Sequence, residues 1–163
     1  MVNALPQKNL PDWSKLVDYR PARVSDLDDI MAIENQSFPT PTRRETYEEE
    51  MGFEFYLKRV AELKQDLSLA GYAFCVMTPP EASINTLAVR KDLRNQGLAS
   101  YLLGKILDDL RDLKVHEAWL QARVNNFAAL ALYSRLGFEK IGVRPKYYPD
   151  TGEDAVLFKK ELA

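Results

Sequence analysis

Residues 84–99, INTLAVRKDLRNQGLA, decide the fold of this chain. The part up to Val89 is mostly apolar or β-branched, which is typical of a largely buried strand. A basic turn follows, with Arg90, Lys91 and Arg94. Beyond it, apolar residues recur at helical spacing, namely Leu98, Leu102, Ile106, Leu110 and Leu113. We therefore expect a strand, a polar turn and a long helix.

The polar turn is a candidate anion-binding site. The first N–H groups of a helix lack intrahelical partners, and the helix dipole places partial positive charge there. Gly97 lets a ligand approach the backbone closely. The alternative is an ordinary connection with solvated Arg and Lys side chains. Nucleotide-hydrolase loops are excluded by spacing, because residues 97–99 lack the glycines of a dinucleotide fingerprint and Gly104-Lys105 falls inside the helix.

Residues 94–99, RNQGLA, resemble the Gln/Arg-x-x-Gly-x-Gly/Ala signature of the GCN5-related N-acetyltransferases (GNAT). In that family this loop holds the pyrophosphate of acetyl-coenzyme A. Further segments have the order and spacing of the RimI-type protein N-terminal acetyltransferases, namely WLQARVNN at 119–126, ALALYSRLGF at 129–138, YYP at 147–149 and EDA at 153–155. The resemblance is close over about residues 70–160 and looser in the first third of the chain.

The resemblance implies an α/β fold of the GNAT type. Its central sheet would be mixed and mostly antiparallel, with about six to seven strands, about four flanking helices and splayed central strands. The resemblance also implies acetyl-CoA as the acyl-donor substrate and no metal. The donor would lie along the central strand and the loop that follows it. The expected contacts are Leu87, Ala88, Val89, Arg94, Asn95, Gln96, Gly97, Leu98, Ala99 and Asn126.

Composition favours a cytoplasmic protein with a single domain. The chain has 163 residues, of which 46% are hydrophobic and 28% charged, as in ordinary globular proteins. No apolar run approaches the roughly 20 residues that span a bilayer, and residues 1–16 do not resemble a signal peptide. The single cysteine, Cys75, is expected to be a buried strand thiol. A net charge of −2 argues against a general nucleic-acid surface, and we expect a monomer or weak homodimer.

The remaining pattern predicts an extended or poorly ordered arm at residues 1–15, followed by one domain at 16–163. Ser25 with Asp28 resembles a capping box for a first helix, and Thr42 is expected to cap a second. Gly104 is expected to allow close packing of the long helix on the sheet. Residues 51–69 fit helix and strand about equally well, and we favour a strand at 56–63. Helices are expected at 26–37, 43–51, 100–114 and 126–136, and strands at 16–20, 56–63, 69–77, 84–89, 119–124, 138–144 and 155–162.

Tyr133 is the expected general acid. It follows Asn126 by seven residues on the same helix, so the two share nearly one face. In the resembled family the tyrosine of this motif protonates the departing thiolate. The alternative is a core tyrosine that packs the helix on the sheet. Asn126 by itself also fits a helix N-cap.

Gln121 departs from the family pattern, which usually has a glutamate base at this position. Glutamine cannot accept a proton in that role, so another group serves or the base is dispensable. Glu81 or Glu34 acting through water are candidates. An α-amine with a pKa of about 8 needs roughly 1.4 kcal/mol to be neutral at pH 7, whereas lysine needs roughly 4.6. An N-terminal amine therefore tolerates the missing base better than lysine does.

The acceptor would enter a mouth shaped by Phe38, Thr42, Glu81, Tyr147 and Tyr148. In the resembled family the loop between the first two helices helps to form this mouth, with an aromatic residue often at the position of Thr42. The tyrosine pair wraps the first residues of the peptide, or else plugs a hairpin. The acceptor that the resemblance implies is a protein N-terminus, such as that of a ribosomal protein. A small amine or lysine acceptor remains open, as does a catalytically weak acetyl-CoA-binding regulatory module.

Overall fold

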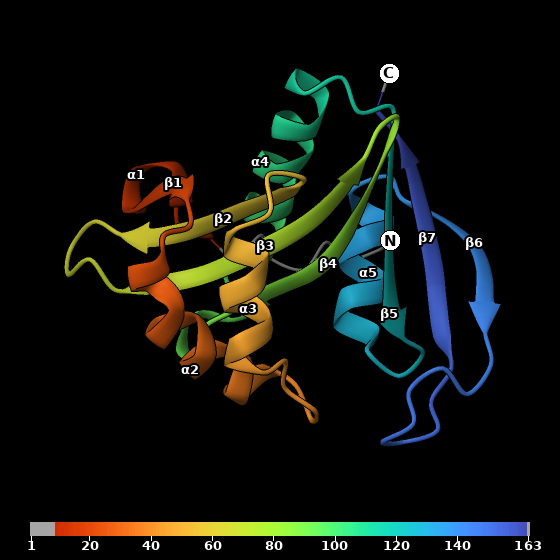
Figure 1. Ribbon diagram of the computed structural model, residues 1–163. Coiled ribbons are helices and arrows are strands. Elements are labelled where there is room, and N and C mark those ends of the chain that lie inside the picture. Colours follow the sequence, from red (N-terminus) through yellow and green to blue (C-terminus); the bar gives the residue numbers. More distant parts are fainter. Residues whose placement is uncertain (1–8, 163) are drawn as a thin grey trace, which may run out of the picture.

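The computed structural model describes residues 9–162. Its framework is a seven-stranded sheet in the order β1-β2-β3-β4-β5-β7-β6 (Figure 1). The strands are β1 Val17–Pro21, β2 Tyr56–Leu63, β3 Leu69–Thr78, β4 Glu81–Val89, β5 Glu117–Arg123, β6 Glu139–Arg144 and β7 Ala155–Glu161. Neighbouring strands are antiparallel except β4 and β5, which are parallel. The expected mixed, mostly antiparallel sheet is confirmed.

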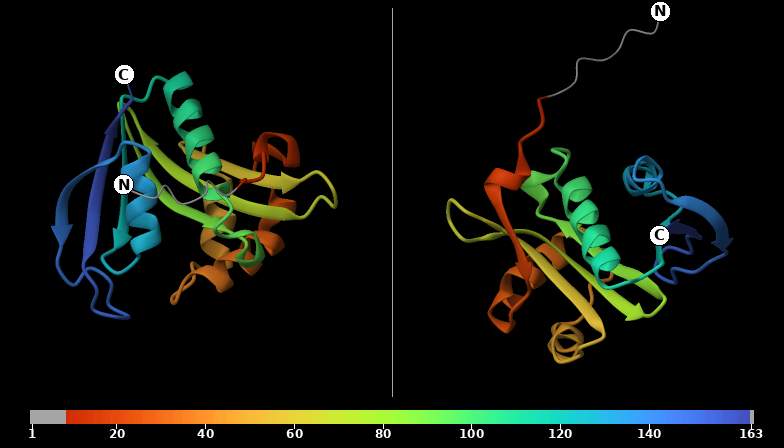
Figure 2. Two further views of the ribbon diagram at one scale, coloured as in Figure 1. Left: turned by 180° about the vertical axis from the view of Figure 1, so that it is seen from behind. Right: turned by 90° about the horizontal axis from the view of Figure 1, so that it is seen from above.

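Helices cover both faces of the sheet. They are α1 Trp13–Leu16, α2 Leu27–Ser37, α3 Arg44–Met51, α4 Leu98–Asp112 and α5 Phe127–Arg135, with short 3-10 turns η1 Val24–Asp26 and η2 Lys91–Leu93. One core cluster joins α2 and α3 to β2 and β3 on one face, and another joins α4 to β5 and β7 on the other. Figure 2 shows the sheet between these layers, with α5 on the α4 side. No helix in the described range is long and apolar enough to cross a membrane.

The expected elements are present, with ends within three residues of the predicted ones. Two predicted caps are wrong. The N–H of Arg23 donates to the Asp26 carboxylate at 2.7 Å, and Ser25 lies inside η1. The N–H of Thr42 donates to Glu34, and α3 begins after Arg43 without a side-chain cap. The local pattern predicts that Thr42 caps the start of α3, but its N–H group is instead hydrogen-bonded to the buried Glu34 carboxylate.

The expected N-terminal arm is only partly within the described residues, since 1–8 lie outside them. Its later part is not an extended arm. Asp12 caps α1 by accepting the N–H of Ser14 at 3.2 Å. Trp13 is only 6% exposed and packs in a third core cluster with α4. Burial of this large aromatic side chain holds the segment against the domain.

The two parallel strands β4 and β5 separate along their length. They pair only at residues 81–83 of β4 and 117–119 of β5, and then diverge (Figure 1). A bulge at Asn85 marks the divergence, because Thr86 pairs with Phe74 and Ile84 with Cys75. Bulges bend a strand and disrupt its ladder. The expected splay of the central strands is thus confirmed.

The expected role of Gly104 is wrong. A Cβ built at Gly104 meets no atom within 4 Å, so the residue does not bring α4 closer to the sheet. Close approach instead occurs at Gly71 in β3. A Cβ there would lie 2.8 Å from the carbonyl oxygen of Ala88 and 2.9 Å from Leu102 Cδ1.

Alanine substitutions at these two glycines should therefore change the free energy of unfolding in opposite directions. Gly71→Ala should lower the free energy of unfolding by about 1–3 kcal/mol, because the methyl group overpacks the β3–β4–α4 contact. Gly104→Ala should raise it by about 0.5–1 kcal/mol, because an open helix position gains a better helix former. Urea unfolding followed by circular dichroism measures both changes. Destabilisation by Gly104→Ala would contradict the open environment.

Candidate functional site

The site is built around the gap between the diverging strands. From Ile84 onward, the edge of β4 that faces β5 has no strand partner among the described residues. Its backbone N–H and C=O groups need another partner, such as a bound substrate. Leu87 is half-buried, whereas Ala88 and Val89 are buried. These three residues, expected to contact the donor, therefore offer backbone groups at the gap.

The loop after β4 leads into the N-terminus of α4. Asn95 and Gly97 have left-handed backbone conformations, with φ of 62° and 82°. Gly97 is the N-cap of α4, and the first turn of the helix contains no acidic residue. Leu98 is buried and Ala99 half-buried, so their backbone N–H groups are the parts suited to an anion.

Two polar side chains of this loop, those of Arg94 and Gln96, form hydrogen bonds within the protein. Arg94 donates to the Val89 carbonyl at 3.0 Å and to the Ser37 hydroxyl at 2.9 Å, which ties α2 to the end of β4. The Gln96 side chain donates to the carbonyl of Asp92 at 3.3 Å. The expected contact of Arg94 with a diphosphate remains a prediction. In this structure the arginine supports the loop from within.

Sequence reasoning missed a groove along the exposed side of α4. Its volume is about 440 Å³, and its lining residues are Ser100, Tyr101, Gly104, Lys105, Leu107, Asp108, Arg111, Leu136 and Lys160. Gly104 leaves space in the groove, and three cations border it. The sequence signal that could have indicated this groove is Gly104 inside a helix, with Arg111 seven residues later on the same helix face.

Tyr133 and Gln121 belong to opposite faces of the sheet. Tyr133 packs its ring against Phe158 at a centroid distance of 5.6 Å and against Phe138 at 6.1 Å, on the α4 side. Residues 118, 120 and 122 of β5 are buried, so strand alternation turns Gln121 to the other face. A molecule in the gap between β4 and β5 can therefore be approached from both sides.

Burial raises the pKa of the Tyr133 hydroxyl and keeps it protonated. Removal from water, together with the nearby Tyr148, raises the pKa of the Tyr133 hydroxyl to about 12. The phenol is protonated throughout the neutral pH range, as a general acid must be. Asn126 caps α5 by accepting the N–H of Ala129 at 3.2 Å. Its expected contact with the donor remains a prediction beside this cap.

Two loops meet at the end of the gap near Arg123. The Thr40 hydroxyl, in the α2–α3 loop, donates to Asp150 in the β6–β7 loop at 3.1 Å. Arg123 donates to both Asp150 oxygens, at 2.8 and 2.9 Å, and its guanidinium lies 4.0 Å from the ring centre of Tyr148. Tyr147 packs edge-on against Tyr148 at 5.1 Å and is 43% exposed.

Glu34 anchors the other side of this mouth. Its side chain is 2% exposed and accepts the Thr42 N–H at 2.7 Å, the Tyr47 hydroxyl at 2.9 Å and the Tyr72 hydroxyl. Burial raises the pKa of both tyrosines, and the Glu34 charge raises them further. Phe38 is half-buried and packs against the same core cluster. The carboxylate thus fixes the loop that carries Phe38 and Thr42.

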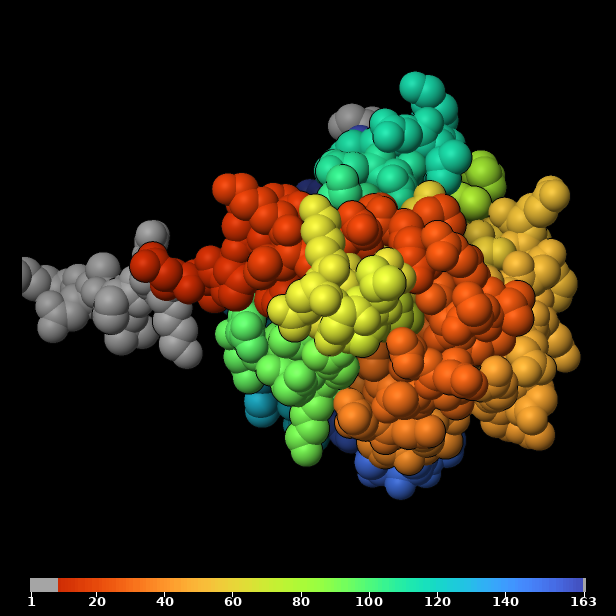
Figure 3. Space-filling view, turned by 90° about the vertical axis from the view of Figure 1, so that its left-hand side faces the viewer, coloured from red at the N-terminus to blue at the C-terminus, as the bar shows by residue number. Residues whose placement is uncertain are grey.

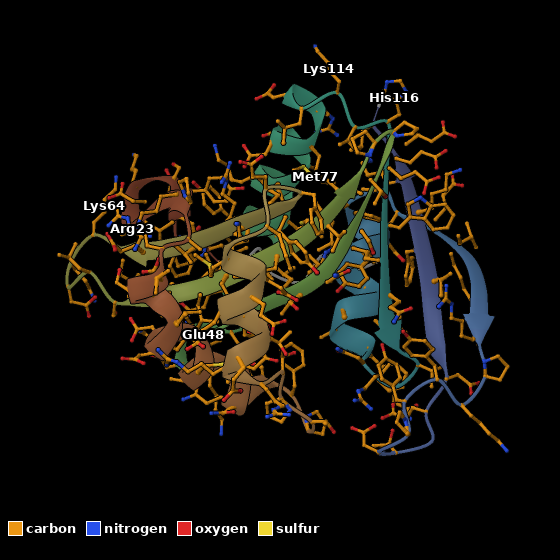
Figure 4. All side chains as sticks on the ribbon, viewed as in Figure 1. Arg23, Glu48, Lys64, Met77, Lys114 and His116 are labelled. Carbon is orange, nitrogen blue, oxygen red and sulfur yellow. The ribbon has the colours of Figure 1, made fainter. Side chains whose placement is uncertain are left out.

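The structure does not bring Glu81 to the mouth. Glu81 pairs with Glu117 at the start of β5, whereas Arg123 ends that strand. His116, just before β5, lies exposed in the turn at the far end, near Lys114 (Figure 4). Within residues 9–162 no group of three or more His, Cys, Asp and Glu side chains is arranged to hold a metal ion.

Comparisons with known proteins agree with this geometry. A model of the acetyltransferase (GNAT) family matches residues 27–138. The [ribosomal protein bS18]-alanine N-acetyltransferase of Escherichia coli K12 is 35% identical over 135 residues, which are 82% of this chain and 89% of that protein. The crystal structure of the Escherichia coli ribosomal-protein-S18-alanine N-acetyltransferase has a TM-score of 0.83 and 30% identity, over 91% of this chain and 95% of that one. Arabidopsis thaliana NAA60 in complex with acetyl-CoA shares the fold, with a TM-score of 0.79 at 19% identity, over 89% and 98% of the two chains.

Because Arg123 and Asp150 form an ion pair, part of the stability of the protein should be lost at acidic pH. The Arg123 hydrogen bond lowers the pKa of Asp150 to about 2. A folded-state pKa below the ordinary value means that the pair contributes stability above about pH 4 and loses it as the pH falls towards 2. Asp150→Asn should therefore flatten the fall of Tm between pH 4 and pH 2. Asp108→Asn, at an exposed pair with Arg111, is the matched control and should keep the native slope. Equal slopes for Asp150→Asn and the native protein would refute the prediction.

Proposed function

This chain belongs to the GNAT acetyltransferase family, and we propose that it acetylates the Nα-amine of a protein N-terminus with acetyl-CoA as the donor. The observation that carries the proposal is the splay of β4 and β5, with an anion-ready loop at the end of β4 and the tyrosine mouth near the end of β5. Relatives named for the alanine of ribosomal protein bS18 favour a ribosomal protein as acceptor. Such an acceptor places the reaction in the cytoplasm, and a monomer suffices for it.

The proposed donor site combines four parts of the chain. The backbone N–H groups of residues 97–100 would bind the diphosphate, helped by the dipole of α4. The open edge of residues 87–89 would hydrogen-bond the pantetheine arm as an added strand does. The groove along α4 would take the nucleotide, with Lys105, Arg111 and Lys160 near its phosphate. Asn126 borders the arm from the start of α5.

The reaction needs one attack and two proton transfers. The nitrogen of the neutral amine attacks the thioester carbonyl carbon, and the carbon–sulfur bond then breaks. Tyr133 gives its phenolic proton to the departing thiolate and is reprotonated from solvent. The amide nitrogen loses its extra proton to water. Gln121 orients the amine by a hydrogen bond but takes no proton, which an α-amine with a pKa of about 8 tolerates.

Glu34 is not needed as the base that takes the proton from the amine. Its carboxylate already accepts three hydrogen bonds from Thr42, Tyr47 and Tyr72, and the side chain is buried. Glu81 lies at the other end of β5. We therefore assign Glu34 to positioning of the acceptor loop and assign Glu81 no part in the reaction.

Tyr133→Phe tests the general acid. The variant keeps the ring that packs against Phe138 and Phe158, so the fold and CoA binding should be unchanged. Turnover should fall by about 100-fold or more, because the thiolate must leave unprotonated. Steady-state kinetics gives kcat, and calorimetry gives the Kd for CoA. Unchanged kcat would remove Tyr133 from the mechanism.

A peptide panel tests the acceptor. Short peptides that begin with alanine and have free N-termini are compared with Nα-blocked versions that contain lysine. We expect turnover of acetyl-CoA only with the free N-termini, since neutralising lysine at pH 7 requires about 3 kcal/mol more than an α-amine. Acetylation of the blocked peptides would favour a lysine acceptor. Tight CoA binding without turnover on any peptide would favour a small amine or a regulatory role.

A further inference from the structure

The segment before β1 is attached to the loop that the proposed function assigns to the diphosphate. The indole Nε1 of Trp13 donates to the backbone carbonyl of Gln96 at 2.8 Å, across 83 positions of sequence. Leu10 lies over the next residue, since a Cβ at Gly97 would be 3.2 Å from Leu10 Cδ1. Figure 3 shows this red segment directly beside the light-green loop.

Trp13 is held rigidly enough to act as an anchor. Its ring packs in one core cluster with Val89 at the end of β4 and with Leu98 and Leu102 at the start of α4. The two elements that flank the loop therefore also fix the indole. A buried tryptophan N–H needs a partner, and here the partner is the carbonyl of Gln96.

The hydrogen bond to Trp13 sets the direction of a neighbouring N–H group. A trans peptide is planar, so the C=O of Gln96 and the N–H of Gly97 point in opposite directions. Because the carbonyl is bound to Trp13, the Gly97 N–H is directed away from α1. Gly97 has a φ of 82° and no Cβ, so its φ, one of the two dihedrals that orient this peptide, is less restricted than in any other residue.

We infer that Trp13 is a positioning residue for the donor: by holding the Gln96 carbonyl, it pre-orients the Gly97 N–H for the diphosphate of acetyl-CoA. The inference rests on the proposed function, because it assumes that this donor is bound. The family model begins at residue 27 and does not include Trp13. The anchor therefore belongs to the N-terminal segment and not to the matched region.

Trp13→Phe removes the N–H and keeps a ring in the core cluster. Calorimetry with CoA should show binding weakened about five- to tenfold, the loss expected for one oriented hydrogen bond. With an excess of a peptide acceptor, the KM for acetyl-CoA should rise by the same factor while kcat stays within about twofold. The matched control is Trp119→Phe, the same change at a half-buried indole whose buried N–H has no partner in the described structure. The control should bind CoA like the native protein.

The control variant also serves as a reporter, because the chain contains two tryptophans. In Trp119→Phe all indole emission comes from Trp13. CoA should change that emission, and pantetheine, which lacks the diphosphate, should not. This measurement keeps the inference testable if Trp13→Phe does not fold.

Native affinity for CoA in Trp13→Phe, or equal emission changes with CoA and pantetheine, would overturn the inference and leave the proposed function intact. A native protein that binds no CoA would overturn both. Equal weakening by Trp13→Phe and Trp119→Phe would show a general loss of packing, and would also overturn the positioning role.

Discussion

The structure depends on a parallel strand pair that is joined at only one end. Three residue pairs hold β4 to β5, and beyond them the strands separate. Parallel strands need a long crossover, which α4 supplies while covering the sheet. The divergence leaves one edge of β4 without a ladder partner and turns the ends of the two strands apart. The loop into α4 thus lies at one end of an open wedge, and the proposed acceptor mouth lies near the end of β5.

Because no backbone hydrogen bonds within the described residues join β4 and β5 beyond residues 83 and 119, side-chain contacts must hold the loops on either side of the gap. Two hydrogen-bonded charged groups do this, one on each side: Glu34, which is buried, and Arg123, which is half-buried. Glu34 is bonded to two tyrosines and one backbone N–H, and Arg123 is bonded to Asp150 and stacked on Tyr148. A buried carboxylate such as Glu34 is strongly destabilising if left unpaired, and the two Arg123–Asp150 hydrogen bonds join β5 to the β6–β7 loop, so each group fixes its loop. The mouth is therefore rigid where it contacts the rest of the protein.

Local sequence patterns predicted the elements and the family motifs, because strand and helix periodicity are properties of neighbouring residues. They did not predict features set by distant partners. Thr42 fits a helix cap by its neighbours, yet Glu34 accepts its N–H. The burial of Glu34 depends on Tyr72, 38 positions away, and the helical fold of residues 13–16 depends on core contacts with α4. Gly104 was assigned to packing because a pattern cannot show that one side of a helix is empty.

The strand order also bears on how this chain folds while it is being synthesised. The last strand, β7, lies between β5 and β6, so it completes two ladders at once. Until residues 155–161 have left the ribosome, β5 has one open edge and β6 has no neighbour. An unpaired edge is a template for aggregation. The nascent protein therefore passes through a stage in which β1 to β4 are paired with one another while β5 and β6 still need protection.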